Sequence, residues 1–243
     1  MSAVRVPYRA GRASGFRYGE LPADVAADLE RTLVARDVAG GTALKERRVY
    51  RRGPWLYKLF PARRRLRDLA RANAAVRSAD LHAALAPIRT PAPLVAVGLR
   101  DGAFAGPSLL VCEFVEGRSL DEVWDRDRAA VDAFARLLAA MHARGIFHGD
   151  LHPKNVLWDG ASWTLIDVGS MRHPLRNLRP RALALDQWAE LDRRLGSPSS
   201  MRAAFELYSA ELGRPAAEAE RAWARVAERS RAVSARRARA DRR

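Results

Sequence analysis

The spacing of hydrophobic and polar residues predicts a chain that begins with a helix, continues mainly as strands and ends as helices. Residues 21–36 place leucine and valine at helical spacing, with acidic residues early, and therefore predict an amphipathic helix. Gly40-Gly41 predicts a tight turn. Two strands are then expected at residues 44–50 and 55–60, joined by a turn at Arg52-Gly53-Pro54.

The middle of the chain combines one helix with two buried strands. Residues 62–86 are rich in Ala, Arg and Leu without Gly or Pro, which predicts a helix that the proline-containing segment 87–93 ends. The apolar runs at 94–99 and 109–115 are short enough to be strands buried in a core. From Ser119 onward the chain is expected to be helical.

The C-terminal half predicts helices around one short strand pair. Residues 131–145 form a strongly amphipathic pattern that Gly145 ends. Short strands are expected at 156–158 and 163–168, with a turn at Asp159-Gly160 between them, and the chain is expected to be helical beyond Pro180. No internal repeat is found.

This order of elements predicts an α+β fold with two lobes. A small β-rich lobe is expected at residues 1–115 and a mainly helical lobe at residues 116–243, with the junction near Val115–Gly117. A length of 243 residues allows one bilobal domain, and 48% hydrophobic residues are enough to bury a core. Wholesale disorder is therefore excluded.

Cysteine content and hydropathy indicate the cellular compartment in which we expect the protein. Cys112 is the single cysteine, which excludes an internal disulfide and fits a reducing environment. The first residues have no apolar core that could serve as a signal peptide, and no run approaches the ~18 apolar residues of a membrane span. We expect a cytoplasmic protein that is soluble or peripheral to a membrane.

The formal net charge of +15 indicates an anionic partner, for which nucleic acid, an anionic membrane surface and a phosphorylated substrate compete. Genomic base composition can also explain scattered arginines in a sequence this rich in Ala and Arg. Lysine remains only at Lys45, Lys58 and Lys154. A lysine kept where arginine is the rule indicates chemistry that needs a compact, rotatable charge.

The strongest motif for chemistry lies at residues 148–167. His148, Asp150 and Asn155 follow the pattern His-x-Asp-x-x-x-x-Asn, and Asp167 follows an apolar strand. An amide oxygen of Asn155 and a carboxylate of Asp167 are ligands that a phosphate-bound Mg²⁺ prefers. Asp150 can orient a substrate hydroxyl and accept its proton in phosphoryl transfer.

With these residues the sequence resembles the protein-kinase-like superfamily, with HGDLHPKN at the catalytic loop and DVG in place of DFG. The resemblance implies a bilobal protein-kinase-like fold that uses ATP and Mg²⁺. It further implies nucleotide-binding roles for one lysine, two glycines of a phosphate loop and two residues of the connector between the lobes: Lys58, Gly40, Gly41, Glu113 and Val115.

Departures from the superfamily pattern narrow the class of substrate that we expect the chain to phosphorylate. Gly149 replaces the arginine that grips a phosphorylated activation segment, and His152 replaces a lysine usual in protein kinases, which disfavours peptide substrates. No glutamate lies between Arg47 and Cys112 to pair with the strand lysine. Three residues are candidates to replace it, and the sequence does not choose among them: Asp68, Asn73 and Asp80.

Within the superfamily, HGDLHPKN and the flanking segments look most like bacterial lipopolysaccharide core kinases, over about residues 38–190. That resemblance implies phosphorylation of a hydroxyl on Kdo or heptose of an anionic glycolipid. A soluble phosphotransferase of the aminoglycoside or choline type, a serine/threonine protein kinase, and a non-enzymatic pseudokinase or nucleic-acid-binding scaffold remain alternatives.

The basic residues near the C-terminus have two competing interpretations. Residues 230–243 can rest on anionic lipid headgroups or form a disordered, solvated arm, and the arm is favoured. Nucleic acid is the least expected partner. Four arginines that follow Asp167 can face an anionic saccharide: Arg172, Arg176, Arg179 and Arg181.

Overall fold

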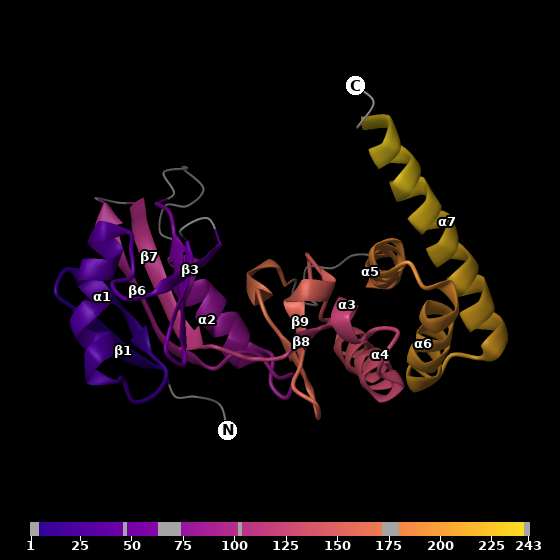
Figure 1. Ribbon diagram of the computed structural model, residues 1–243, viewed down its shortest axis with the longest axis horizontal. Helices are drawn as coiled ribbons and strands as arrows, with labels where there is room; N and C mark the ends of the chain where they lie inside the picture. Colours follow the sequence, from indigo (N-terminus) through magenta and orange to yellow (C-terminus); the bar gives the residue numbers. More distant parts are fainter. Residues whose placement is uncertain (1–4, 46–47, 63–73, 102–103, 172–179, 241–243) are drawn as a thin grey trace. The chain divides into compact units, whose positions relative to one another are not determined.

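The structure, a computed structural model, describes all residues except 1–4, 46–47, 63–73, 102–103, 172–179 and 241–243. The chain divides into two units, Met1–Val115 and Glu116–Arg243, which we describe separately (Figure 1). The first unit is built around a large antiparallel sheet and the second mainly from helices. The predicted α+β fold, with a β-rich and a helical part, is confirmed.

A seven-stranded sheet forms most of the first unit, and every neighbouring pair of its strands is antiparallel. The spatial order is β1-β2-β6-β7-β5-β4-β3, so the two strands from the apolar runs lie in the interior of the sheet. The strands are β1 (Val6–Ala10), β2 (Ala13–Arg17), β3 (Thr42–Lys45), β4 (Val49–Arg52), β5 (Trp55–Phe60), β6 (Pro93–Asp101) and β7 (Phe104–Glu113).

Helices cover both faces of this sheet. Successive side chains of a strand point to opposite faces, so an apolar strand places residues to be buried on both faces. Val95 and Val97 of β6 lie in one core cluster with Leu29 and Leu33 of α1 (Ala23–Ala35). The intervening Ala96 lies in a second cluster with α2 (Ala74–Ala84). Full burial of each such Leu or Val contributes roughly 1.5–3 kcal/mol. The predicted helix at 21–36 and the buried strands are therefore confirmed.

Two expectations for the first unit are wrong. The residues before α1 form a hairpin, β1 and β2, which turns at Gly11 with φ 56°. The partly buried Val6, Tyr8 and Ala10 alternate with exposed residues, a period-2 signal that sequence reasoning passed over. The run expected as one strand at 44–50 forms two strands, because β3 ends at Lys45 and β4 pairs with it from Val49.

The second unit combines a small sheet with five α-helices within the residues that the structure describes. β8 (Arg118–Ser119), β9 (Val156–Trp158) and β10 (Trp163–Leu165) form an antiparallel sheet in the order β10-β9-β8. The helices are α3 (Leu120–Val123), α4 (Arg128–Ala143), α5 (Pro180–Leu195), α6 (Pro198–Glu211) and α7 (Ala216–Ala240).

Aromatic side chains join α5, α6 and α7. Trp188 of α5 lies with its ring centroid 5.4 Å from Phe205 and 5.1 Å from Tyr208, both on α6. Phe205 in turn lies 5.4 Å from Trp223 of α7. Such pairs contribute about 0.5–1.5 kcal/mol each beyond the burial of their surface. These contacts fix α5, which carries part of the candidate active site.

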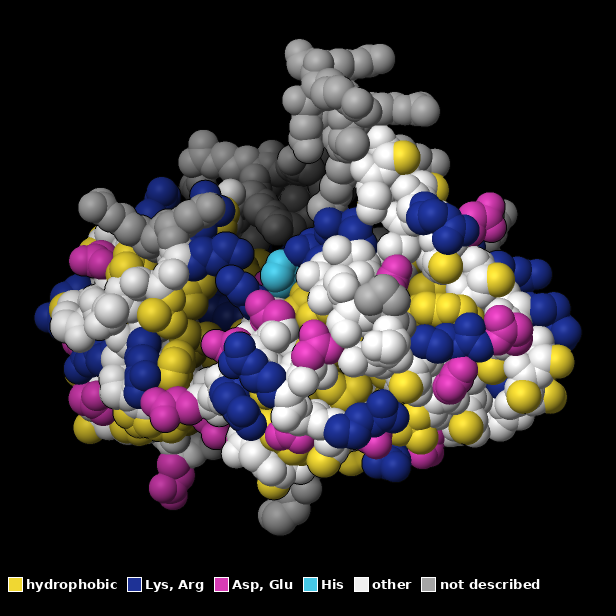
Figure 2. Space-filling model, turned by 45° about the vertical axis from the view of Figure 1, so that its right-hand side comes forward, with side chains coloured by type: hydrophobic (Ala, Val, Ile, Leu, Met, Phe, Trp, Pro, Cys, Tyr) yellow, Lys and Arg dark blue, Asp and Glu magenta, His cyan; other side chains and the backbone are white. Residues whose placement is uncertain are grey.

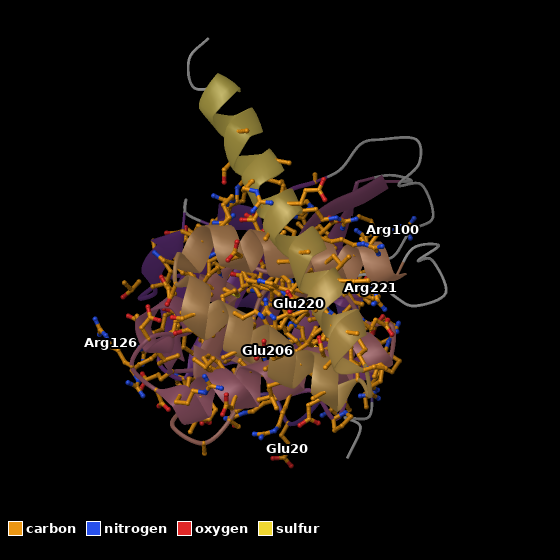
Figure 3. The ribbon with its side chains drawn as sticks, turned by 90° about the vertical axis from the view of Figure 1, so that its right-hand side faces the viewer. Glu20, Arg100, Arg126, Glu206, Glu220 and Arg221 are labelled. Carbon is orange, nitrogen blue, oxygen red and sulfur yellow. The ribbon has the colours of Figure 1, made fainter. Side chains whose placement is uncertain are left out.

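Ion pairs between α6 and α7 are secondary to this aromatic packing. Arg202 of α6 binds Glu206 of its own helix and Glu220 of α7, and Figure 3 labels the two glutamates. The carboxylates are 55% and 61% exposed. Exposed pairs of this kind contribute about 0–1 kcal/mol, less than the buried rings.

Two expectations for the second unit also need correction. The strand expected at 163–168 ends at Leu165, because Asp167 adopts left-handed backbone angles, φ 57° and ψ 43°, that a strand cannot continue through. The disordered arm expected at 230–243 is helical to Ala240 as the end of α7. The strand at 156–158 and the helices beyond Pro180 are confirmed.

Candidate active site

The catalytic-loop residues predicted from sequence lie between the end of α4 and the start of β9. Gly145, with φ 68°, stops the helix, and the Ile146 N–H returns to the Met141 carbonyl at 2.9 Å. A short 3-10 turn at Pro153–Asn155 then leads into β9, with the His152 ring accepting from the Lys154 N–H at 3.1 Å. The loop is therefore fixed at both ends by local hydrogen bonds.

His148 holds the loop to the end of β10. Its ring is 1% exposed, its Nδ1 accepts from the Asp150 N–H at 3.2 Å, and its Nε2 lies 3.3 Å from the Ile166 carbonyl. Nε2 must donate to that carbonyl, so the ring is neutral. Burial lowers the pKa of His148, which agrees with a neutral ring. Both ring nitrogens are thus engaged in hydrogen bonds that hold the loop, and the predicted catalytic role of His148 stays a prediction.

Asn155 connects the loop to the segment that carries Asp167. Its Nδ2 donates to the Asp150 carbonyl at 3.0 Å, and its own carbonyl accepts from the Ile166 N–H at 2.9 Å. Asp167 follows directly, and the fields of Asp167 and Asp150 both act on the His148 ring. The four predicted residues of this unit, His148, Asp150, Asn155 and Asp167, are therefore brought together.

The donor set formed by Asn155 and Asp167 fits a magnesium ion bound with nucleotide phosphates. Because Nδ2 of Asn155 is bonded to the loop, its amide oxygen faces the other way and can serve as a ligand. Among the described residues, no group of three or more His, Cys, Asp or Glu side chains is arranged to hold a metal ion alone. Mg²⁺ does not need one, since it commonly takes one or two protein ligands, phosphate oxygens and water.

A buried chain of hydrogen bonds runs from α6 to the catalytic loop. Tyr208 Oη lies 2.9 Å from Nδ1 of His142, whose Nε2 lies 2.6 Å from Oε1 of Gln187. Nε2 of Gln187 donates to the His148 carbonyl. Burial lowers the pKa of His142 to about 4, so this ring is neutral and can donate through Nε2 while accepting through Nδ1. All donors in the chain therefore point toward the loop.

Sequence reasoning missed this buried chain, although two signals were available. His142 lies on the apolar face of the amphipathic helix that was predicted, where a polar ring needs partners. Gln187 is the single glutamine of the sequence and lies on the buried side of α5. A pattern in sequence does not say that these two side chains meet, because they are 45 positions apart.

A pocket of about 450 Å³ lies beside the loop, within the range of about 300–1,000 Å³ that is typical of small-molecule sites. One wall is the loop from Phe147 to Leu151, which includes Asp150. The other wall is one face of α5, because its residues recur at helical spacing: Leu183, Asp186, Gln187, Glu190 and Arg194. The candidate base therefore borders a cavity that can admit a sugar ring.

The predicted nucleotide-binding residues lie in the first unit, on or beside adjacent strands. Lys58 of β5 faces Leu110 of β7 in the strand register, and Glu113 ends β7 opposite Trp55. The Glu113 N–H is bonded to the Ala92 carbonyl at 2.9 Å, so a contact of Glu113 with adenine would need its carbonyl. Val115 is half-buried just beyond β7. The roles of these residues stay predictions.

The remaining predictions for the first unit concern the glycine turn and the partner of Lys58. Gly40 has φ 70°, and the Gly41 N–H bonds the Val38 carbonyl at 2.9 Å. Asp80, one candidate for the missing glutamate, is bonded to Arg5 at 3.0 Å and to the Tyr18 hydroxyl at 3.0 Å. The other two candidates, Asp68 and Asn73, lie outside the described residues.

Cys112, the single cysteine of the sequence, is fully buried in β7. Burial raises the pKa of its thiol to about 11, and the charge of Lys58 acts in the opposite direction. The thiol therefore lies within the field of the predicted strand lysine. It is protonated near neutral pH and packs as a small apolar side chain.

Comparison with known proteins identifies the family. The sequence model of the lipopolysaccharide kinase (Kdo/WaaP) family matches residues 22–203, well over half of the chain. The chain belongs to this family. The matched range includes all predicted site residues of both units, from Gly40 and Lys58 to Asp150 and Asp167.

Curated relatives of this family member include two 3-deoxy-D-manno-octulosonic acid kinases of Xanthomonas campestris pv. campestris, strains B100 and 8004. Each is 36% identical over 99 residues, which cover 39% of this chain and 40% of the relative. The match thus spans less than half the length of these relatives.

Two solved structures show the same fold. WaaP, solved in complex with acyl carrier protein, has a TM-score of 0.52 at 18% identity and covers 79% of this chain and 87% of its own. WbdD has a TM-score of 0.50 at 19% identity and covers 78% of this chain and 50% of its own. At these identities the likeness concerns the fold alone.

Both signs of charge occur on the face of this family member that Figure 2 shows. Figure 2 shows Lys and Arg side chains interspersed with Asp and Glu over the visible face, not gathered in one continuous basic patch.

Among the described helices, none combines the length and the apolar character that crossing a membrane requires. The arginines predicted to face a saccharide, Arg172, Arg176 and Arg179, lie outside the described residues, as does the side chain of Arg181.

Proposed function

We propose that this chain is a kinase that transfers the γ-phosphoryl group of ATP to a hydroxyl of a lipopolysaccharide sugar. The observation that carries the proposal is the position of Asp150, in the wall of a pocket of about 450 Å³ and on a loop held by hydrogen bonds to the His148 ring and from the Asn155 amide. A carboxylate held in this way is arranged to receive a proton from an alcohol in the pocket. Membership of the Kdo/WaaP family supports the same assignment.

In the proposed reaction, Asp150 orients the acceptor hydroxyl and takes its proton. The hydroxyl oxygen forms a bond to the γ-phosphorus, the bond from that phosphorus to the β–γ bridging oxygen breaks, and ADP leaves. His148 and Asn155 hold the Asp150 backbone in place during this proton transfer. A positioned base of this kind contributes about 10²–10⁴-fold to the rate.

Nucleotide-binding roles are proposed for residues of the first unit. Lys58 contacts phosphate, the Glu113 carbonyl and the Val115 backbone contact adenine, and Gly40-Gly41 lie near the phosphates. Asn155 and Asp167 supply ligands for Mg²⁺. When bound, this ion neutralises charge on the phosphate oxygens.

We propose a cytoplasmic location with contact to the inner face of the membrane, where such a glycolipid is accessible. Arg231 on α7 is exposed and can face anionic headgroups, whereas the side chains beyond residue 235 lie outside those the structure describes. A juxtamembrane basic residue contributes about 1 kcal/mol near an anionic surface, so such contact would be weak and reversible.

The test is phosphate transfer from ATP–Mg²⁺ to a Kdo-containing acceptor, followed by mass spectrometry of the product. We expect transfer by the wild type and a loss of about 10²–10⁴-fold in Asp150→Asn, with unchanged binding of nucleotide. The matched control is Asp125→Asn, which removes an exposed carboxylate bonded to Ser200 at 3.0 Å, and which should retain activity. Wild-type protein that binds ATP–Mg²⁺ but transfers nothing would instead support the pseudokinase alternative.

A further inference from the structure

The proposed function leaves open how the pocket selects its acceptor, and the charges on its α5 wall bear on this. Asp186 of that wall is paired with Arg229 of α7 at 2.6 Å, and Arg229 also donates to the Ala182 carbonyl at 2.8 Å. Glu190 is bound by Arg193 at 2.7 Å and by Arg194 at 2.6 Å. Both acidic side chains of α5 that line the pocket are therefore neutralised by arginine.

Asp150 differs from these two acids. Within the part of the chain that the structure describes, its carboxylate has no ion-pair partner. Among the described residues that line the pocket, one carboxylate is thus uncompensated, and it is the proposed base. A cationic acceptor such as an aminoglycoside would need a wall of uncompensated acids, which α5 does not offer.

Arg194 is the one basic side chain among the described residues that line the pocket. Its Nε binds Glu190, and its terminal Nη nitrogens make no hydrogen bond to any other described residue. The side chain is 25% exposed, so it is partly desolvated yet open to the cavity. A guanidinium held by one nitrogen can present its remaining donors to a second oxyanion in a two-pronged contact.

We propose, on the basis of the proposed function, that Arg194 determines acceptor specificity by binding an anionic group of the sugar, opposite the base Asp150. Glu190 fixes the guanidinium of Arg194, because Arg193 and Arg194 together lower the pKa of Glu190 to about 2 and keep it ionised. The anionic group is an oxyanion, either the carboxylate of an acidic sugar or a phosphate already present on the glycolipid. Both have the planar or forked oxygens that a guanidinium binds.

The chain offers a matched control. Arg193 binds the same glutamate as Arg194, through Nε at 3.0 Å and Nη2 at 2.7 Å, but it does not line the pocket. Arg193→Gln and Arg194→Gln therefore remove the same charge from neighbouring positions of one helix. Arg194→Lys keeps the charge and removes the fork. Thermal unfolding of each variant shows whether the fold is retained.

The experiment measures binding by titration calorimetry, so that it does not depend on transfer. The probes are a methyl glycoside of 3-deoxy-D-manno-octulosonic acid, its methyl ester, and a phosphate-bearing sugar glycoside with its dephosphorylated form, each titrated into the full chain. A hydrogen-bonded charge pair corresponds to roughly a 10- to 100-fold difference in Kd. We expect the wild type and Arg193→Gln to prefer one anionic probe over its neutral counterpart by that factor. Arg194→Gln should bind both members of the pair equally, and Arg194→Lys should be intermediate.

The outcomes separate the two sources of the anion and the two proposals. Preference for the acid over its ester identifies a carboxylate, and preference for the phosphorylated probe identifies a phosphate; either supports the role of Arg194. Three results would overturn the role of Arg194. The preference for the anionic probe could persist in Arg194→Gln, it could be lost equally in Arg193→Gln, or the wild type could show no preference. Discrimination by Arg194 in a wild type that transfers no phosphate would leave the binding role intact and reject the kinase reaction.

Discussion

The loop His148–Asn155 and the turn Gly40-Gly41 differ in how the rest of the chain holds them. In the loop, the His148 ring accepts from the Asp150 N–H and the Asn155 amide donates to the Asp150 carbonyl, and Gln187, on a helix that follows in sequence, donates to the His148 carbonyl. Among the described residues, the turn makes one short-range backbone bond, from the Gly41 N–H to the Val38 carbonyl. One candidate element is therefore fixed by buried side chains and the other by local backbone geometry.

This difference shows which part of the candidate site is held more firmly in place. Rigid placement matters most for a base that must meet a proton, since a displacement of about 1 Å can cost 10²-fold in rate. A turn that contacts phosphate through backbone N–H groups tolerates more adjustment, because the ligand helps to order it. We expect substitutions behind the loop to have larger effects than substitutions in the turn.

Among substitutions that test this difference between the loop and the turn, the largest effect is expected when Gln187 is replaced by leucine. This change leaves the buried Nε2 of His142 and the carbonyl of His148 without their partner. Each of these two unsatisfied groups costs about 1–3 kcal/mol, so the free energy of unfolding should fall by about 2–6 kcal/mol. The rate of phosphate transfer should fall by about 10²-fold as the loop shifts. Urea unfolding and steady-state kinetics measure the two quantities.

Tyr208→Phe is the matched variant for this prediction. It removes the partner of His142 Nδ1 at the far end of the same chain of hydrogen bonds, but leaves the contact of Gln187 with the loop. It should lower stability by about 1–3 kcal/mol and change the rate much less than Gln187→Leu does. Equal loss of rate in the two variants would mean that Gln187 acts through stability alone and does not position the loop.

A smaller effect is expected from the pH dependence of stability. Burial lowers the pKa of His142 to about 4, below its usual value of 6.5, while the charge of Arg214 acts in the same direction. Below pH 6.5 the unfolded chain gains a proton that the folded ring does not, so stability is lost as pH falls. Between pH 7.5 and 5 the loss from this group is about 2 kcal/mol.

The check is urea unfolding at both pH values in the wild type and in His142→Gln. The variant should lose much of the pH dependence whatever its stability at pH 7.5, and the buried His148 should contribute the remainder, because its pKa is also lowered. Glu190, whose pKa is about 2, titrates below this window. An unchanged slope in the variant would contradict a neutral, buried His142.

Residues differ in how far their sequence predicts their place in the site. His148, Asp150, Asn155 and Asp167 lie within one short stretch, so their spacing already predicts that they meet. Gln187 and Tyr208 come from helices whose packing depends on the aromatic contacts of Trp188, which no local pattern encodes. The hairpin β1–β2 was missed because its alternation is short and contains Pro7.

The glycine turn should show the smallest effects, and they test its assignment to phosphate binding. Gly40 has φ 70° and open space around its Cα, so Gly40→Ala costs about 1–2 kcal/mol of backbone strain without a clash. A Cβ on Gly41 would meet Cγ1 of Val38 at 2.9 Å, so Gly41→Ala must displace the Val38 side chain.

If the turn binds phosphate, both alanine variants should raise the KM for ATP a few-fold, whereas the KM for the sugar stays constant. Gly53→Ala is the control, since Gly53 also has positive φ and open space but lies in the hairpin turn between β4 and β5. It should show the same strain with no change in either KM. Because Gly40 and Gly53 share the strain of positive φ and differ in position, a rise in the KM for ATP confined to Gly40 and Gly41 would support the phosphate loop. An equal rise in the KM for ATP in all three variants would mean that the turn only connects elements of the fold and does not bind phosphate.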